Sequence, residues 1–110
     1  MSKRLWSTDA RWAMRDEVHY GDRMVRCYVD RPTNLDQVFR NTVERHALAP
    51  ALVLGRETMD YRTLDDLVEN MAGNLARIGV QKGDRVALLL GNRFEFVYVT
   101  LAAARIGAIT

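Results

Sequence analysis

Apolar side chains recur at helical spacing most clearly in the middle of the chain. Because residues three, four and seven apart lie on one face of an α-helix, this pattern predicts an amphipathic helix packed on a core. Asp60 is the favoured N-cap, with Thr63 as the alternative. Gly79 suits the left-handed residue after a helix, and Val80 is placed to fold back on the last turn. The stripe consists of Leu64, Leu67, Val68, Met71, Leu75 and Ile78.

A second helix is expected earlier in the chain. Asn34, with Gln37 three residues later, resembles a capping box in which each residue bonds the other's backbone amide. The helix should end before Pro50, because proline lacks the amide hydrogen that a helix interior needs. Its stripe is Leu35, Val38, Phe39, Thr42, Val43 and His46.

A third helix is expected near the carboxyl end. Asn92 and Glu95 form another capping pair, and Gly107 follows the last apolar position of the pattern. The Ala102-Ala103-Ala104 run would let this helix approach a neighbour closely. Its apolar positions are Phe94, Val97, Tyr98, Leu101, Ala102 and Ile106.

Short apolar runs between these helices predict strands. Residues 51–54, the turn at Gly55-Arg56-Glu57 and residues 58–59 indicate a hairpin. The run 85–90 is almost wholly apolar, as in strands covered on both faces of a parallel sheet, and residues 108–110 resemble the start of another strand. The order strand, helix, strand, helix, strand predicts an α/β fold with a parallel-type sheet and right-handed crossover helices. That sheet would be incomplete at Thr110, so we expect a truncated domain.

Residues 1–33 lack a sustained period and are expected to be an irregular lead-in, with at most a short strand near residues 24–29. Pro32 disfavours helix at the residue before it and marks a boundary. The predicted organisation is therefore a lead-in over 1–33 and the beginning of an incomplete α/β domain over 34–110.

Charge and length exclude some partners. The formal net charge of the 110 residues is +2, an excess too small to indicate a nucleic-acid partner. The single cysteine, Cys27, forms no internal disulfide, and Met1–Met14 carries charges where a secretory signal would be apolar. The longest apolar run, Val86–Leu90, is far shorter than the roughly 20 residues of a membrane span. The sequence thus predicts a cytoplasmic protein without a transmembrane segment.

The chemically versatile side chains favour structural roles. His19 and His46 have no cysteine or carboxylate at a recognised metal-ligand spacing, so a surface or capping role is favoured for both. Cys27 lies between arginines but no base accompanies it in a known motif, which favours a half-buried inert thiol over a nucleophile. Trp6 and Trp12 are expected to pack the lead-in against the rest of the complete protein rather than dock a partner or membrane.

Three acids, Asp65, Asp66 and Glu69, cluster near the start of the central predicted helix. The helix macrodipole favours negative charge there, which explains them better than a paired-carboxylate catalytic site. From the residues alone we predict no catalytic, cofactor-binding or metal-binding residue in this chain.

Four stretches in fixed order carry a family resemblance. Each has a folding reason: the string from Gly79 to Val86, for example, stops a helix, makes a turn and starts a strand, and no phosphate-binding glycine loop follows a strand here. The stretches are Pro50-Ala51-Leu52-Val53, then Asp60-Tyr61-Arg62-Thr63-Leu64-Asp65, then residues 75–88 (LARIGVQKGDRVAL), and last Asn92 with Glu95-Phe96-Val97 leading to Ala103-Ala104-Arg105-Ile106-Gly107-Ala108-Ile109.

With these stretches, residues 34–110 resemble the start of the AMP-binding domain of acyl-adenylate-forming enzymes, of the acyl-CoA synthetase or fatty-acid–CoA ligase type. Firefly-type luciferases and the adenylation domains of peptide synthetases belong to the same superfamily. Gly91 stands where the family often has proline, and Thr63 where it often has glutamate. Both departures affect turns and caps, and neither bears on catalysis.

The resemblance implies an ATP-dependent ligase as the full-length protein. A small carboxylic acid would attack ATP to give an acyl-adenylate and pyrophosphate, and the thiol of coenzyme A would then displace AMP. Mg²⁺ and cationic groups would neutralise the triphosphate. In the family these groups lie on a Ser/Thr/Gly-rich loop, later acidic and arginine motifs and a carboxy-terminal lysine, all beyond Thr110, so this chain alone is expected to be inactive.

Three questions stay open at this point. The acceptor could be a carrier-protein phosphopantetheine, or the second step an oxidation, instead of transfer to coenzyme A. The acid could be fatty, aromatic or carnitine-like, and the full-length enzyme could form a homo-oligomer. A different class of function is also open: an independent small α/β binding or interaction domain without enzymatic activity.

Overall fold

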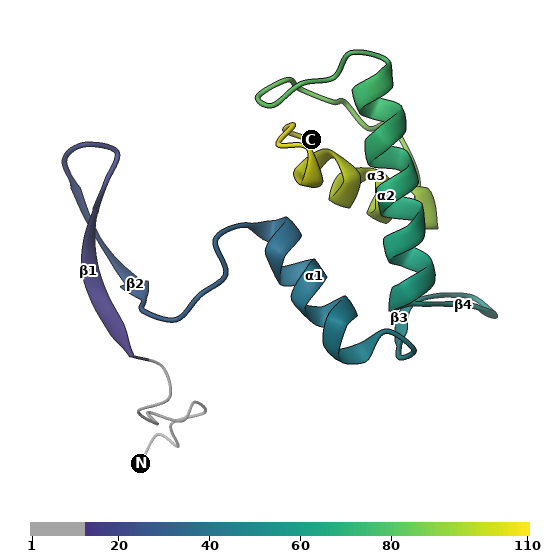
Figure 1. Ribbon diagram of the computed structural model, residues 1–110, viewed down its shortest axis with the longest axis horizontal. Helices are drawn as coiled ribbons and strands as arrows, with labels where there is room; N and C mark the ends of the chain where they lie inside the picture. The colour runs from purple at the N-terminus through teal and green to yellow at the C-terminus, as the bar shows by residue number, and fades with distance from the viewer. Residues whose placement is uncertain (1–12) are drawn as a thin grey trace. The chain divides into compact units, whose positions relative to one another are not determined.

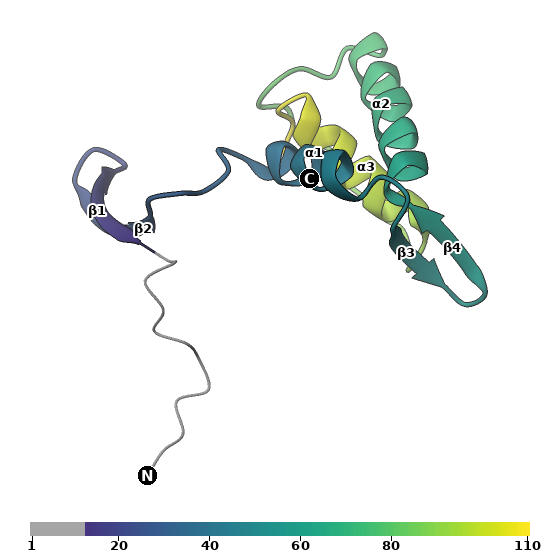
Figure 2. The ribbon, with the colours of Figure 1, turned by 60° about the horizontal axis from the view of Figure 1, so that its bottom comes forward.

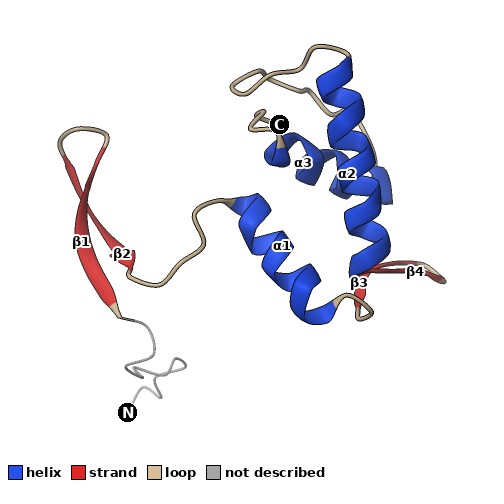
Figure 3. Cartoon of the chain, in the orientation of Figure 1, coloured by secondary structure: helices blue, strands red, loops and turns tan. Residues whose placement is uncertain are grey.

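The computed structural model describes residues 13–110, so the predictions for Trp6 and Trp12 concern residues outside the described part of the chain. The chain divides after Pro32 into two compact units, Met1–Pro32 and Thr33–Thr110. Figure 3 shows that strands form the described part of the first unit, whereas helices dominate the second. Each unit is described by itself below.

The first unit contains an antiparallel hairpin of β1 (Met14–His19) and β2 (Arg23–Tyr28). Positive φ angles at Tyr20 and Gly21 reverse the chain between the two strands. The expectation of an irregular lead-in is therefore wrong for these residues, although a short strand was expected at the position of β2. The pattern was weak because all side chains of the two strands are at least partly exposed, so no buried face imposes a clear alternation.

The second unit contains three helices and a small hairpin in the order α1 (Leu35–His46), β3 (Pro50–Leu54), β4 (Glu57–Asp60), α2 (Tyr61–Arg77) and α3 (Phe94–Arg105). All three predicted helices and the predicted hairpin are confirmed. Helix α2 is the longest and contacts both α1 and α3 (Figure 1). The antiparallel β3–β4 hairpin leads directly into the first turn of α2, as Figure 2 shows.

The core of this unit lies where the three helices meet. Val68 of α2 and Ala102 of α3 are both 0% exposed, and the small alanine side chain lets the two helices approach closely. Ile78 was expected on the buried stripe of α2 but is 77% exposed, because α2 ends at Arg77 and Ile78 lies in its C-cap. The buried cluster consists of Phe39, Leu64, Val68, Ala72 and Ala102.

Two of the predicted N-caps are confirmed. Asn34 Oδ1 accepts a hydrogen bond from the Gln37 amide (2.9 Å), and Asp60 Oδ1 accepts one from the Thr63 amide (2.7 Å). The Gln37 side chain, however, accepts from the Thr33 amide at 2.6 Å instead of the Asn34 amide. The capping box expected at Asn34 is thus displaced by one residue.

The predicted ends of α2 and α3 are confirmed, but the predicted start of α3 is not. Gly79 has a φ of +100°, and the Val80 amide donates to the Leu75 carbonyl at 3.0 Å, which closes α2 as expected. The pair expected to cap α3 is wrong: the N-cap is Arg93, and it makes no side-chain cap hydrogen bond. Gly107, at φ +78°, ends α3, and a Cβ there would lie 2.8 Å from Lys82 Cγ.

The strand expected over residues 85–90 is wrong. Only Arg85 pairs, in an isolated parallel bridge to Ile109. Two hydrogen bonds of 2.8 Å support the bridge: the Val86 amide donates to the Ile109 carbonyl, and the Ile109 amide donates to the Asp84 carbonyl. A strand needs a neighbour's backbone groups along its length, and the described chain provides residues 87–90 with none. The unit is α/β as predicted, but its one sheet, β3–β4, is an antiparallel pair, and parallel pairing in this unit is limited to the bridge.

Between residues 13 and 110, no helix combines the length and the apolarity needed to cross a lipid bilayer.

Candidate functional site

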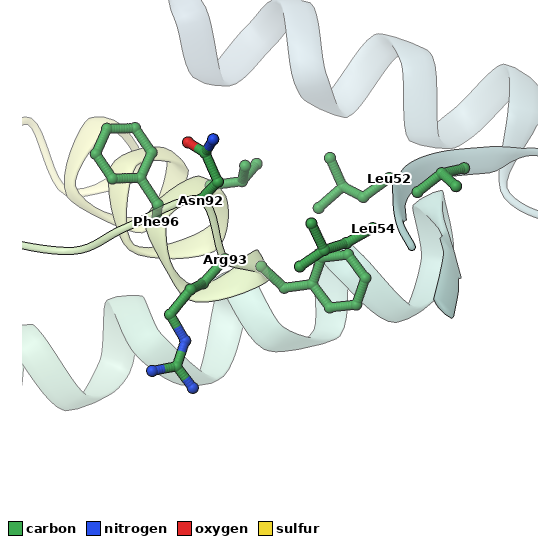
Figure 4. A pocket seen from close by; sticks show the side chains of 8 residues that line it. Leu52, Leu54, Asn92, Arg93 and Phe96 are labelled. Carbon is green, nitrogen blue, oxygen red and sulfur yellow. The ribbon is translucent and has the colours of Figure 1, made fainter. Parts of the chain in front are cut away.

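A shallow hollow of about 180 Å³ lies between strand β3 and the start of helix α3. In Figure 4, Leu52 and Leu54 of β3 stand opposite Asn92 and Arg93, and the Arg93 guanidinium points away from the strand. Arg93 pairs instead with Glu95, at an Nε–Oε2 distance of 3.5 Å. The hollow is smaller than the roughly 300 Å³ of typical ligand pockets, and its lining holds no nucleophile or base. It can bury apolar groups but cannot by itself catalyse a reaction.

A second hollow, of about 420 Å³, borders α3 and the segment before it. Its lining comes from Val86–Leu88, from Phe96 and Thr100 of α3, and from Thr110, and it contains no charged side chain. The neighbouring Leu89 is fully exposed, and Phe96 is 44% exposed. One side of α3 and the segment before it therefore present apolar surface.

The strongest polar constellation in the second unit surrounds Arg105, at the end of α3. Its guanidinium bonds three carboxylates, each at 2.8 Å: Nε to Asp36 of α1, Nη2 to Asp65 and Nη1 to Glu69 of α2. The Arg105 side chain is only 6% exposed, and its guanidinium lies 5.9 Å from the centroid of the Phe39 ring. One planar side chain with a fixed fork of donors thus joins all three helices.

This network corrects the interpretation of the acids on α2. Helix α2 begins at Tyr61 and has no acidic residue in its first turn, so the macrodipole does not account for Asp65 and Glu69. Both instead neutralise Arg105, which approaches them from a different helix. Because the guanidinium is engaged on three sides, the arrangement is a structural clamp rather than a site for substrate.

The electrostatics of Asp36 agree with this role. Burial raises the pKa of Asp36, but hydrogen bonds from Arg105 and from Arg40 (Nε–Oδ2, 2.7 Å) more than offset that effect and lower the pKa overall. Burial lowers the pKa of Arg105, and the bonds to Asp36 and Asp65 outweigh it and raise that pKa. Asp36 and Arg105 are therefore both charged at neutral pH.

In the first unit, the hairpin brings together three residues that sequence spacing did not connect. His19 Nε2 lies 3.0 Å from Glu17 Oε2 and 3.6 Å from Cys27 Sγ, and all three side chains are half-buried. Spacing along the chain gave His19 no carboxylate or cysteine partner, but the strand register places both beside it. His46, by contrast, is exposed at the end of α1, in the surface position that was expected.

Arginines hold the carboxylate of this group. Arg31 donates from Nη2 to Glu17 Oε2 and Arg15 from Nε to Oε1, both at 2.7 Å. These bonds, with that from Arg31 as the largest cause, and the bond from His19 lower the pKa of Glu17 far below its usual range. A recognisable hairpin turn at Tyr20-Gly21 was the one sequence signal that could have predicted the group, because the turn sets the strand register.

The helix starts and hollows of the second unit place few cationic groups where a nucleoside triphosphate would need them. A phosphate site at a helix start needs free amides. Side-chain caps occupy the starts of α1 and α2, and the cap of α2 is the anionic Asp60, whereas the start of α3 has no side-chain cap but carries the acidic Glu95 in its first turn. Arg93 is the one charged residue among those lining the two hollows, and it pairs with a carboxylate. We therefore assign no step of ATP chemistry to these side chains.

Comparison with known proteins gives consistent matches. A family model described as AMP-binding enzyme matches residues 39–110. An uncharacterised protein of Mycobacterium tuberculosis (strain H37Rv) is 32% identical over 111 residues, which cover 96% of this chain and 61% of that protein. The long-chain-fatty-acid–CoA ligase of Yersinia pestis is 35% identical over 81 residues, covering 73% of this chain and 14% of the ligase.

Among solved structures, the N-terminal subdomain of NpsA from Klebsiella oxytoca superposes with a TM-score of 0.66 at 27% identity. The superposition covers 68% of this chain and 20% of that subdomain. The chain thus spans about three fifths of the mycobacterial relative and much less of the ligase and the subdomain.

Proposed function

The chain belongs to the AMP-binding enzyme family, and we propose that it forms the amino-terminal scaffold of an ATP-dependent acid–thiol ligase of the acyl-CoA synthetase type. The full-length enzyme would convert a carboxylic acid and ATP into an acyl-adenylate and pyrophosphate, then transfer the acyl group to coenzyme A. Mg²⁺ would accompany ATP, and the enzyme would act in the cytoplasm. Residues 13–110 would contribute folding and packing rather than catalytic groups.

The observation that carries this proposal is how the match is distributed. The family model covers 39–110, the part of the chain that holds α1 beyond its first turn, the β3–β4 hairpin, α2 and α3. The alignment with a fatty-acid–CoA ligase covers 73% of this chain but only 14% of the ligase. A segment this small relative to the ligase can be a scaffold without containing the reactive groups.

The apolar surface beside α3 supports the same role. Leu89, Leu90 and Phe96 are exposed, and the hollows next to them are lined by apolar side chains. Covering such surface stabilises a protein by about 25 cal/mol for each Å² removed from water. We propose that further parts of a full-length ligase pack here and complete the strand that Arg85 and Ile109 only begin.

A chimera tests this proposal directly. Residues 34–110 would replace the matching segment of the Yersinia pestis ligase, and the chimera would be assayed for acid-dependent ATP–pyrophosphate exchange and acyl-CoA formation with a panel of fatty and aromatic acids. We expect activity within about tenfold of the parent ligase, because the scaffold adds no reacting group (~1.4 kcal/mol in barrier height). The 110-residue chain alone is expected to show no exchange.

A matched control separates scaffold failure from loss of chemistry. A second chimera carrying Arg105→Met lacks the clamp between the helices. Its unfolding temperature should be lower than that of the first chimera, while its activity should be kept at temperatures where it is still folded. A wild-type chimera that unfolds at the parent's temperature yet shows no exchange with any acid would contradict the proposal.

One observation favours a second candidate function. The mycobacterial relative is short enough for this chain to span 61% of it, so related proteins of modest length exist. Such a protein would be a small binding or interaction domain built on the same α/β unit. Reading the gene beyond Thr110 discriminates the two: an open frame leading to a Ser/Thr/Gly-rich loop supports the ligase, and a stop codon supports the small domain.

A further inference from the structure

Three different metal-ligating side chains converge on one face of the first hairpin. Glu17 and His19 are two residues apart on β1 and so share a face, and Cys27 joins them because its strand partner, Arg15, also lies on that face. One carboxylate oxygen, one imidazole nitrogen and one sulfur all lie within 4.8 Å of one another.

The distance between the sulfur and the ring nitrogen matches that around a single tetrahedral ion. With Zn–S near 2.3 Å and Zn–N near 2.1 Å, tetrahedral angles separate sulfur from nitrogen by about 3.6 Å. Cys27 Sγ and His19 Nε2 are 3.6 Å apart, and Glu17 Oε2 lies 3.0 Å from the same nitrogen. Both neighbours approach the same ring nitrogen, so the imidazole cannot pass a proton from one to the other through its two nitrogens.

We propose that Glu17, His19 and Cys27 bind a divalent transition-metal ion, with Zn²⁺ as the expected metal and a fourth coordination position open to water. A thiolate and an imidazole select zinc over the hard cations magnesium and calcium, which prefer oxygen ligands only. The three side chains are half-buried, so an ion can enter from solvent without unfolding the hairpin.

The arginines around Glu17 orient the carboxylate for this role. Arg31 and Arg15 fix both oxygens, and metal binding replaces the contacts that His19 Nε2 makes with Glu17 Oε2 and with Cys27 Sγ. Ligating carboxylates are commonly held by such outer hydrogen bonds, whose loss weakens metal affinity about 10- to 100-fold. The two guanidinium charges also repel the cation, so the site should bind zinc more weakly than a closed site with four protein ligands.

Cobalt titration of the whole 110-residue chain tests the proposal. The protein would be freed of metal with a chelator, kept reduced, and titrated with Co²⁺, whose spectrum reports both geometry and sulfur ligation. We expect one equivalent to produce tetrahedral d–d bands and a thiolate-to-cobalt charge-transfer band, both removed by Zn²⁺. Cys27→Ser should abolish the charge-transfer band, and His19→Ala should weaken binding at least tenfold.

Two further variants complete the design. Arg31→Met removes the outer hydrogen bonds to both Glu17 oxygens and also a repelling charge; the loss of orientation should dominate and weaken Co²⁺ binding about 10-fold or more, while the charge-transfer band persists at saturation. His46→Ala removes an exposed imidazole outside the group and should leave the titration unchanged. Absence of a charge-transfer band in the folded wild-type chain at saturating Co²⁺ overturns the proposal, as does Cys27→Ser binding Co²⁺ with an unchanged spectrum.

Discussion

Replacing Arg105 by methionine should destabilise the second unit by about 2–4 kcal/mol. Methionine keeps most of the buried length of the side chain but removes its charge, leaving carboxylates that are partly shielded from water. Asp36 is 16% exposed, so its bond to Arg105 should contribute about 1.5–3 kcal/mol, as hydrogen bonds to charged groups do. Asp65 is 34% exposed and Glu69 is 70% exposed, so together they add only about 1 kcal/mol after screening by solvent.

Urea unfolding at neutral pH, followed by circular dichroism at a helix wavelength, measures this change. The described helices all lie in the second unit, so the signal reports on the clamp and not on the first hairpin. Arg105→Lys should give an intermediate loss, because an ammonium group cannot present three fixed donors to three carboxylates.

Arg40→Ala is the matched control. Arg40 also pairs with Asp36, but its side chain is 55% exposed and it lies one turn away on the same helix, so its loss should cost no more than about 0.5 kcal/mol. If Arg105→Met proved no more destabilising than Arg40→Ala, the buried network would not be what holds the three helices together.

Three other perturbations have defined outcomes in the same unfolding assay. Gly73→Ala, in the interior of α2 with open space around it, should raise the unfolding free energy by about 0.5–1 kcal/mol. Gly107→Ala should lower the unfolding free energy by at least about 1 kcal/mol, because φ is positive there and Lys82 blocks the new Cβ. Equal effects of the two substitutions would contradict this reasoning. Leu64→Ala should cost about 2–5 kcal/mol, because the side chain is 2% exposed, and a loss below 1 kcal/mol would mean that the core relaxes to fill the space. Stability should fall as the pH drops below about 4. Folding lowers the pKa of Asp36, so the unfolded chain binds more protons than the folded chain, and acid favours the unfolded chain. Asp36→Asn should flatten this acid limb.

Sequence reasoning succeeded where the information lies within one stretch of chain. The period of α2, the cap at Asp60 and the stop at Gly79 all act over a few residues, and the structure confirms them. The family resemblance rested on stretches of the same local kind, and the comparisons confirm the family. None of these conclusions required knowing which distant residues contact each other in the folded protein.

The failures also have physical reasons. The run after Arg85 has the composition of a buried strand, but a strand exists only where another backbone accepts and donates its hydrogen bonds, and the described chain offers one bridge. Asn92 has a good capping side chain, yet α3 starts two residues later, with Arg93 as its cap. Propensity describes what a residue can do, and packing decides whether it does so.

The amino-acid sequence by itself determined the helices, the second hairpin and the family, because each depends on residues close together along the chain. Only the tertiary structure decided that Arg105 meets Asp36 and Asp65, which lie 69 and 40 residues away, and that Glu17, His19 and Cys27 share one face. Contacts between distant residues depend on how helices cross and on how strands register. No local pattern encodes the helix crossings, and the turn at Tyr20-Gly21 is the one local signal for the register of β1 and β2.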